Sequence, residues 1–462
     1  MGRGSRAPAS IGGAVALALL ASAGVAHADT APADSTFTWK GITLYGIVDV
    51  GLQYDSHAAP FSDYFQAGSA DIVQKNSRRA QFGVTSSNLS QSRVGLQGTE
   101  PLEFLGSDWA GIFRVETFFN PASGDISDAL HSLVQNNGRA LANQTTNLDS
   151  SIAGEMFEQS FAGFSSPTYG TITFGRQNTI LADGIAKYDP NATAYAFSLI
   201  GLSGTAAGGG DTQSRRFDQA MKYTYNAHGI HAGAIYKFGG YGTQENSAYQ
   251  FMLGGEYAGF SVDAFYSKVK DAVAVSALSA AQVTDLPALG LSSSNSLAGT
   301  ISDNTTYSLE GLYTMGQFKI FASYENITYR NPEVKLPVGF DDIGGYKLAV
   351  VNNAAYNEEK ILQVYWGGVK WSVNGNLDLT AAYYGYHQSS YATGKEAGCT
   401  TILSSACEGE LHTISFDAVY RLSKHFDTYA GVMWTEVQNG QANGYIYSKN
   451  NINPTIGVRF RF

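Results

Sequence analysis

The sequence predicts an all-β protein, a 16-stranded antiparallel transmembrane β-barrel. Three observations lead to this fold class. Strand-length segments alternate apolar and polar side chains, and every second connector between them is long. Only 15% of the 462 residues are charged, against about 25% in soluble domains. After residue 28 no apolar run reaches the roughly 20 residues of a membrane-spanning helix. A barrel with one face in lipid and one in water accounts for all three.

The first 28 residues have the composition of a secretory signal peptide. Arg3 and Arg6 precede an apolar stretch at 11–25, and the A-x-A pattern that signal peptidase favours ends at Ala28. We therefore expect cleavage after Ala28, with residues 29–462 forming the barrel domain.

Charge and cysteine content exclude several classes of partner and site. The formal charge is −10, and −12 once residues 1–28 are removed. With no Lys/Arg-rich run, the chain is not expected to bind nucleic acid. Cys399 and Cys407 form no metal-binding pattern with other residues, so we expect no metal and no cofactor. Because the compartment outside the cytoplasm is oxidising, we expect a disulfide between these two cysteines.

Residues 42–54 show the strand pattern most clearly. Their even positions are apolar or Gly, whereas Thr43, Asp49 and Gln53 lie on the other face. The same alternation predicts sixteen strands, at residues 42–54, 92–98, 109–120, 156–165, 171–177, 217–225, 230–238, 249–257, 260–269, 305–314, 317–326, 361–371, 376–386, 411–421, 426–437 and 454–462.

The connectors between these strands alternate in length. Short ones lie at 258–259, 315–316, 372–375 and 423–425, and long ones at 55–79, 121–155, 178–215, 270–304, 327–360 and 387–410. A membrane barrel has this arrangement, with short periplasmic turns and long extracellular loops. No proline falls inside a predicted strand, where it would remove a ladder hydrogen bond. The Ala-rich residues 271–283 predict a short helix in a long loop.

Several motifs resemble a known family. They read TLYGIVD at 43–49, SRVGLQG at 92–98, FAGF at 161–164, YGTITFGRQ at 169–177, YRLSK at 420–424 and GVRFRF at 457–462. In this order and spacing the chain resembles the trimeric general porins of Gram-negative bacteria, of the betaproteobacterial and neisserial type. The resemblance spans the whole mature chain and implies an outer-membrane channel for passive diffusion of ions and small hydrophilic solutes.

The resemblance also implies how the pore is narrowed. In such porins the third long loop, here 178–215, folds into the lumen and faces a ladder of basic residues on the wall. Opposed rows of acid and base create a transverse field that orients water and dipolar solutes. The loop acids are Asp183, Asp189 and Asp211. The expected wall bases are Arg93 and Arg216, which match ladder positions, with Arg114 and Lys222, which have polar parity on their strands.

One residue departs from the family pattern. Relatives usually carry an arginine at the position of Glu158, in the fourth predicted strand. If Glu158 faces the lumen, the ladder loses one positive charge and gains one negative charge. We therefore expect a weaker anion preference than in relatives, or a cation preference.

The resemblance implies partners as well. The terminal Phe462, with Phe460 on the same face, is similar to the signal that the outer-membrane assembly machinery recognises. We expect a homotrimer in the cell outer membrane, in contact with its lipid and with lipopolysaccharide.

Other functions remain open at this point. A substrate-selective channel would need an aromatic track for sugars, for which Tyr45, Tyr384 and Tyr386 have lumen parity. A barrel enzyme is less favoured because the chain has no G-x-S-x-G, H-E-x-x-H or P-loop motif. An adhesin acting through the long loops would form no general pore.

Overall fold

The structure is a computed structural model that describes most of the chain. The described residues are 37–57, 80–122, 124, 157–200, 215–239, 247–277, 284, 286–290, 297–334, 348–393, 406–442 and 448–462.

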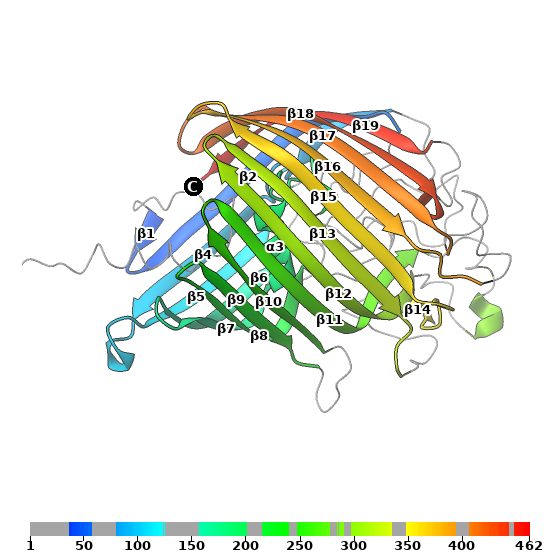
Figure 1. Ribbon diagram of the computed structural model, residues 1–462, viewed down its shortest axis with the longest axis horizontal. Coiled ribbons are helices and arrows are strands. Elements are labelled where there is room, and N and C mark those ends of the chain that lie inside the picture. Colours follow the sequence, from blue (N-terminus) through cyan, green and yellow to red (C-terminus); the bar gives the residue numbers. More distant parts are fainter. Residues whose placement is uncertain are drawn as a thin grey trace, which may run out of the picture.

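Sixteen antiparallel strands of the described residues form a closed barrel, as predicted (Figure 1). Each strand pairs with its neighbour along the chain. The first eight are β2 (Ile42–Asp55), β4 (Arg93–Pro101), β5 (Ala110–Phe118), β6 (Gln159–Ser166), β7 (Gly170–Asn178), β8 (Arg216–Ala227), β9 (Ile230–Lys237) and β10 (Ala248–Tyr257). The others are β11 (Phe260–Ala277), β12 (Leu297–Met315), β13 (Phe318–Arg330), β15 (Lys360–Ser372), β16 (Leu377–Gln388), β17 (Gly409–Arg421), β18 (Phe426–Asn439) and β19 (Asn450–Arg461).

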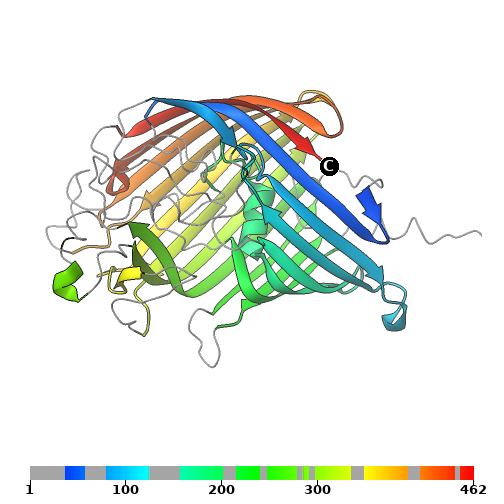
Figure 2. The same cartoon turned by 180° about the vertical axis from the view of Figure 1, so that it is seen from behind.

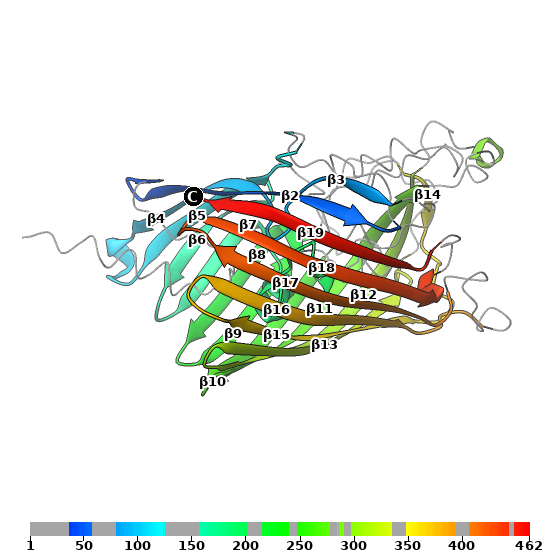
Figure 3. The same cartoon turned by 90° about the horizontal axis from the view of Figure 1, so that it is seen from above.

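The barrel closes where the last strand meets the first. β19 pairs with β2 from Thr455↔Gln53 to Arg461↔Ile47, and Figure 3 shows the two strands side by side. Beyond this ladder, Phe462 and Gly46 exchange two backbone hydrogen bonds of 3.0 and 3.1 Å. A Cβ on Gly46 would lie 2.4 Å from the Phe462 ring, so closure in this register requires glycine there.

Three short strands add to the barrel ladder. β1 (Thr38–Trp39) pairs with the start of β2, and β14 (Leu348–Asn352) runs parallel to the start of β12. β3 (Gln81–Ser86) pairs with the second half of β2, whose first half pairs with β4. The second barrel strand is thus interrupted at the buried residues 87–92. The sequence analysis predicted its part at 92–98 but not β3.

Short turns lie at the predicted places to within one residue, and two of the turns in the barrel show why such turns are tight. His228 and Gly229 join β8 to β9, and Ala258 and Gly259 join β10 to β11, all four with positive φ. Two consecutive residues of positive φ match the right-handed twist of a hairpin. Each turn therefore reverses the chain in two residues.

β11 and β12 extend furthest beyond their predicted bounds. β11 continues to Ala277 and β12 begins at Leu297, and they pair across a register shift between Val269 and Ala272. The predicted helix at 271–283 is therefore wrong for 271–277, and 278–283 lie outside the described residues. The preference of alanine for helix amounts to less than about 1 kcal/mol per residue, and an adjacent strand edge offers backbone partners instead.

The described residues include one α-helix of nine residues, α3 (Ile180–Tyr188), in the third long connector. Thr179 caps its N-terminus, because its hydroxyl accepts a hydrogen bond of 3.1 Å from the Ala182 N–H. Short 3-10 segments are η2 (Glu103–Leu105), η6 (Leu286–Leu289) and η8 (Gly440–Ala442). No helix in the described ranges is long and apolar enough to cross a membrane.

The alternation of side chains assigns the two faces of the wall. On β12, Leu309 is 56% exposed and points outward, whereas its neighbours Ser308 and Glu310 are buried and point inward. Large apolar side chains such as Leu253 and Phe416 lie on the same outer surface. The low charge content thus reflects a surface that meets lipid, as predicted.

We predict that Leu309→Arg destabilises the folded barrel by about 2–4 kcal/mol, the cost of a cationic side chain at mid-membrane on the lipid face. Urea-dependent folding into lipid vesicles measures this. Thr314→Arg on the inward face of the same strand is the control and should change the free energy of folding far less. Equal effects of the two substitutions would contradict the assignment of faces.

Candidate functional site

The interior of the barrel is the candidate site, and the described part of the third long connector is built into it. α3 packs against the inner faces of β9 to β13, and Figure 2 shows the helix within the barrel. A hydrophobic cluster lies between this connector and the wall. Its members include Ile180, Leu181, Ile185, Leu199, Phe217, Phe265, Trp366 and Tyr384.

Two ion pairs hold α3 to the wall, and the helix supplies the acid in one of them and the base in the other. Asp183 on the helix pairs with Lys222 on β8. One turn later, Lys187 on the helix pairs with Asp263 on β11 at 2.9 Å. Between them stands Gly184, where a Cβ would lie 2.3 Å from the Phe265 ring. A side chain at position 184 would push the helix away from the wall and into the lumen.

Asp189, which follows α3, organises the next segment. Its carboxylate accepts hydrogen bonds from the Ser198 hydroxyl (2.6 Å), the Tyr384 hydroxyl (2.7 Å) and the Thr193 N–H (2.7 Å). Burial raises the pKa of Asp189, and these donors oppose that shift. Asp189 thus fastens the connector to β16 instead of facing the pore.

Aromatic residues of the wall add further anchors. The Trp366 indole N–H donates to the Tyr188 carbonyl at 3.1 Å, and the Tyr386 hydroxyl donates to the Leu199 carbonyl at 3.1 Å. Tyr384 and Tyr386 are both 0% exposed. They therefore offer no surface to a passing sugar, and the observation that favoured an aromatic track does not hold for them.

The connector continues to the interrupted strand. The Ala196 N–H donates to the Asn88 carbonyl at 3.0 Å, and the Phe197 ring meets the Tyr429 ring edge-on at 6.4 Å. Residues 179–200 thus follow the inner wall from β8 round to β18 and segment 87–92. The strands against which α3 packs do not include β4 to β7, whose inward side chains Glu116 and Gln159 are nevertheless buried.

The wall from β4 to β7 carries charged and polar side chains. Arg93 on β4 lies 3.7 Å from Glu116 on β5. Glu116 also accepts hydrogen bonds from the Tyr45 hydroxyl at 2.8 Å and the Gln159 amide at 3.0 Å. Arg114 donates to the Gln97 side chain at 2.9 Å and lies over the Tyr45 ring at 5.6 Å.

Glu158 precedes β6 and is 0% exposed. Its carboxylate lies 2.9 Å from Arg216 and 3.7 Å from Arg176. Arg176 pairs in turn with Asp218, and Arg216 lies over the Phe118 ring at 4.7 Å. Glu158 therefore compensates an arginine behind the lumen surface rather than presenting a bare acid to solutes.

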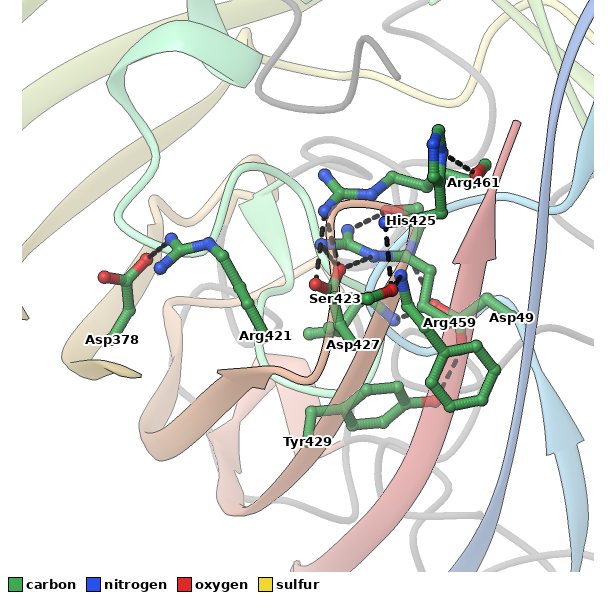
Figure 4. Close-up of polar contacts among 12 residues, drawn as sticks. Asp49, Asp378, Arg421, Ser423, His425, Asp427, Tyr429, Arg459 and Arg461 are labelled. Atoms are coloured by element: carbon green, nitrogen blue, oxygen red, sulfur yellow. Dashed lines mark hydrogen bonds and ion pairs between the residues drawn. The ribbon is translucent and has the colours of Figure 1, made fainter. Parts of the chain in front are cut away.

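A second polar network lies near the short-turn end, on β2, β18 and β19 (Figure 4). Asp427 is buried between two guanidinium groups, 2.8 Å from Arg459 and 3.0 Å from Arg461. The Tyr429 hydroxyl donates to Asp49, which also accepts from the N–H groups of Leu89 and Ser90 at 2.8 and 2.9 Å. This network ties segment 87–92 to the closing strands.

Charge is therefore unevenly distributed around the described interior. The inward arginines lie on β4, β5, β7, β8, β17 and β19. The strands behind α3 carry buried acids instead, namely Asp263 on β11, Glu310 on β12 and Glu325 on β13. Bases and acids on different parts of a pore wall create a transverse field in the pore.

The candidate residues of the sequence analysis fall in several places. Arg93, Arg114, Arg216 and Lys222 are all inside the barrel, and Asp183 and Asp189 contact the wall. Phe460 and Phe462 lie at the closing seam, with ring centroids 6.1 Å apart. Ala28, Asp211 and Cys399 lie outside the described residues, whereas Cys407 is buried. The disulfide and the signal peptide stay predictions.

Sequence reasoning missed the residues that fasten the third connector. It did not single out Arg176, Lys187, Asp263 or Trp366. A helical period of apolar residues at 180–188, preceded by Thr179 as a cap, is a signal that locates α3. No local pattern reveals its partners on β11 and β15, which lie 70 residues or more further along the chain.

Comparison with known families agrees with this geometry. Residues 13–440 match the family model for the Gram-negative porins. The chain belongs to the Gram-negative porin family. It is an outer-membrane porin channel, located in the outer membrane. Over 401 residues it is 24% identical to an outer membrane porin protein of Bordetella pertussis, a match that covers 85% of this chain and 80% of that protein.

Solved structures share the fold of this porin at low sequence identity. OmpT of Vibrio cholerae, an outer-membrane protein, superimposes with a TM-score of 0.55 at 14% identity, covering 92% of this chain and 99% of OmpT. The outer membrane channel DcaP of Acinetobacter baumannii gives a TM-score of 0.50 at 12% identity, covering 91% and 97%. These similarities support the barrel.

We predict that Glu158→Gln shifts ion selectivity toward anions. The substitution keeps the shape but leaves Arg216 and Arg176 without their shared acid. One unit charge at about 10 Å in water changes the energy of an ion by about 0.4 kcal/mol, so the chloride-to-potassium permeability ratio should rise about two- to fourfold. Reversal potentials in planar bilayers under a KCl gradient measure it.

Glu256→Gln is the matched control for this measurement. Glu256 is exposed near the short turn between β10 and β11, and its loss should alter the ratio less. An unchanged reversal potential in Glu158→Gln would show that the buried pair does not influence the ions.

A separate prediction concerns the anchor at Asp189. Tyr384→Phe removes one of its donors and leaves a buried carboxylate oxygen short of a partner, at a cost of about 1–3 kcal/mol. We expect a looser third connector, visible as greater open-channel current noise. Tyr383→Phe, on the outer face of the same strand, should leave the noise as in the native protein. Quiet currents in Tyr384→Phe would contradict the anchoring role.

Proposed function

We propose that this porin is a passive general-diffusion channel for ions and small hydrophilic solutes, not an enzyme and not a channel dedicated to one solute. The observation that carries the proposal is the polar lining of the barrel interior, in particular the charged side chains of β4 to β8. Arginines of these strands lie on one part of the wall, and α3, with buried acids behind it, lies against another. A channel lined in this way favours small polar solutes by charge and hydration rather than by shape.

Weak ion selectivity is part of this proposal. Of the acids along the wall from β4 to β7, Glu116 faces Arg93, and Glu158 faces Arg216. Paired charges cancel at a distance of several ångströms, so a passing ion meets a small net charge. Because Arg216 neutralises the charge of Glu158, the loss of anion preference expected from Glu158 is smaller than for an unpaired acid.

A homotrimer is the proposed assembly. The family resemblance supports it, and so does the likeness in fold to OmpT of Vibrio cholerae in its trimer form. The wall is also lowest on one side, where β4 to β7 contain 8 or 9 residues each, against 13 to 19 in β11 to β13. A low wall suits a side covered by neighbouring subunits.

Further partners are proposed on the same basis. Lipopolysaccharide would surround the outer rim of the barrel. The assembly machinery would recognise the last strand, which ends in Phe462 at the seam. Residues 1–28 would act as the export signal, and a disulfide between Cys399 and Cys407 would form outside the cytoplasm.

Planar-bilayer recording and liposome swelling test the proposal together. We predict three equal closing steps from one inserted particle, low ion selectivity, and swelling rates that fall smoothly with the size of neutral sugars. A steep preference for one sugar among isomers of equal size would favour a selective channel instead. The absence of swelling and of conductance would argue against a pore.

A further inference from the structure

A cavity of about 210 Å³ lies inside the barrel between α3 and the wall, near the short turns. Strands β7 to β11 contribute to its lining, together with the turn between β6 and β7. Pockets for drug-sized ligands measure about 300–1,000 Å³. An occupant of this cavity is therefore a small solute.

The helix presents two opposite charges to this cavity. Asp183 and Lys187 are four residues apart, so they lie on the same helical face, and both line the cavity. Their side chains are 19% and 23% exposed, whereas the wall partner Asp263 is 3% exposed. Each helix charge is thus paired with the wall yet still accessible to a solute.

A buried histidine lies at the end of the cavity near Lys187. His231 is 2% exposed and lines the cavity, and its Nδ1 lies 2.7 Å from the Asp263 carboxylate. Its Nδ1 also lies 3.3 Å from the Lys187 ammonium. His231 thus forms one polar cluster with Lys187 and Asp263 at this end of the cavity.

The rest of the lining combines an apolar surface with small polar groups. Ile180, Met252 and Phe265 provide the apolar part, and Thr171 and Thr224 provide hydroxyls. Charges of both signs beside an apolar surface match a molecule that has an ammonium, a carboxylate and a short hydrocarbon chain. A polyol would use the hydroxyls but leave the accessible charges unmatched, and a simple anion or cation would meet one repelling group.

We propose that this cavity is a subsite that retains small zwitterions of amino-acid size within the channel. The solute ammonium lies by Asp183. The carboxylate lies by Lys187, and the side chain packs on Met252 and Phe265. The subsite lies beside the main opening, so the inference depends on the channel admitting solutes and not on its lack of selectivity.

L-leucine is the probe for the test, applied to the full-length protein in planar bilayers while excess current noise is recorded. Three molecules of similar size without the full charge set serve for comparison: 4-methylpentanoate, isoamylamine and sorbitol. We expect leucine to bind at least tenfold more tightly than each of them. Equal affinity for leucine and sorbitol would overturn the proposal. Equal affinity for leucine, 4-methylpentanoate and isoamylamine would overturn it as well.

Substitutions locate the binding. Thr224→Ile fills part of the cavity and should weaken leucine binding at least tenfold. Thr314→Ile is the control. Thr314 is also on an inward face near the short turns but lies outside the cavity, so this substitution should not weaken leucine binding. Lys187→Met removes the cation and should weaken leucine binding while sparing isoamylamine. Native-like leucine binding in either Thr224→Ile or Lys187→Met would overturn the subsite. KCl conductance, recorded for every variant, reports whether the channel itself is intact.

Discussion

Backbone hydrogen bonding in lipid is the constraint on which this structure depends. Every N–H and C=O within the bilayer needs a partner, and a closed sheet provides one without free edges. The closure rests on the pairing of β19 with β2 and on the two bonds between Phe462 and Gly46. Once the sheet is closed, side-chain alternation gives a lipid face and a water face. The low charge content of the chain follows from that division.

A barrel of sixteen strands leaves an interior that its wall cannot fill. The third connector supplies the missing structure, and it does so with contacts usual in a soluble core. Apolar residues of α3 meet the wall, and the polar groups among them are paired, as at Asp189 and Lys187. The wall acids behind the helix are thereby buried, while the arginines of β4 and β5 stay near the opening. Anchoring the connector and separating the charges are two results of the same packing.

The period-two pattern allowed the sixteen strands to be predicted because it is local and repeats. It failed where tertiary pairing outweighed local preference, as at the Ala-rich end of β11, and it missed β3, which residues 87–92 separate from β4. For the interior, strand parity showed that Arg93 and Lys222 face inward but did not show which residues they pair with. Tyr384 shows the limit: its parity was assigned, yet its hydroxyl serves Asp189, a residue 195 positions away.

Glu158 illustrates why a change of charge cannot be judged without its neighbours. Alone on the wall, an acid in place of a base would alter the local charge by two units. Buried 2.9 Å from Arg216, the carboxylate instead cancels a charge that was already there. An unpaired carboxylate at this depth would carry a desolvation cost of several kcal/mol, so the pair is expected to persist in the open channel. The field at the opening then depends on charges that keep contact with water, Arg93 and Arg114 on the wall and Asp183 and Lys187 on α3. Selectivity should respond to substitution of these four residues more directly than to the total charge of the chain.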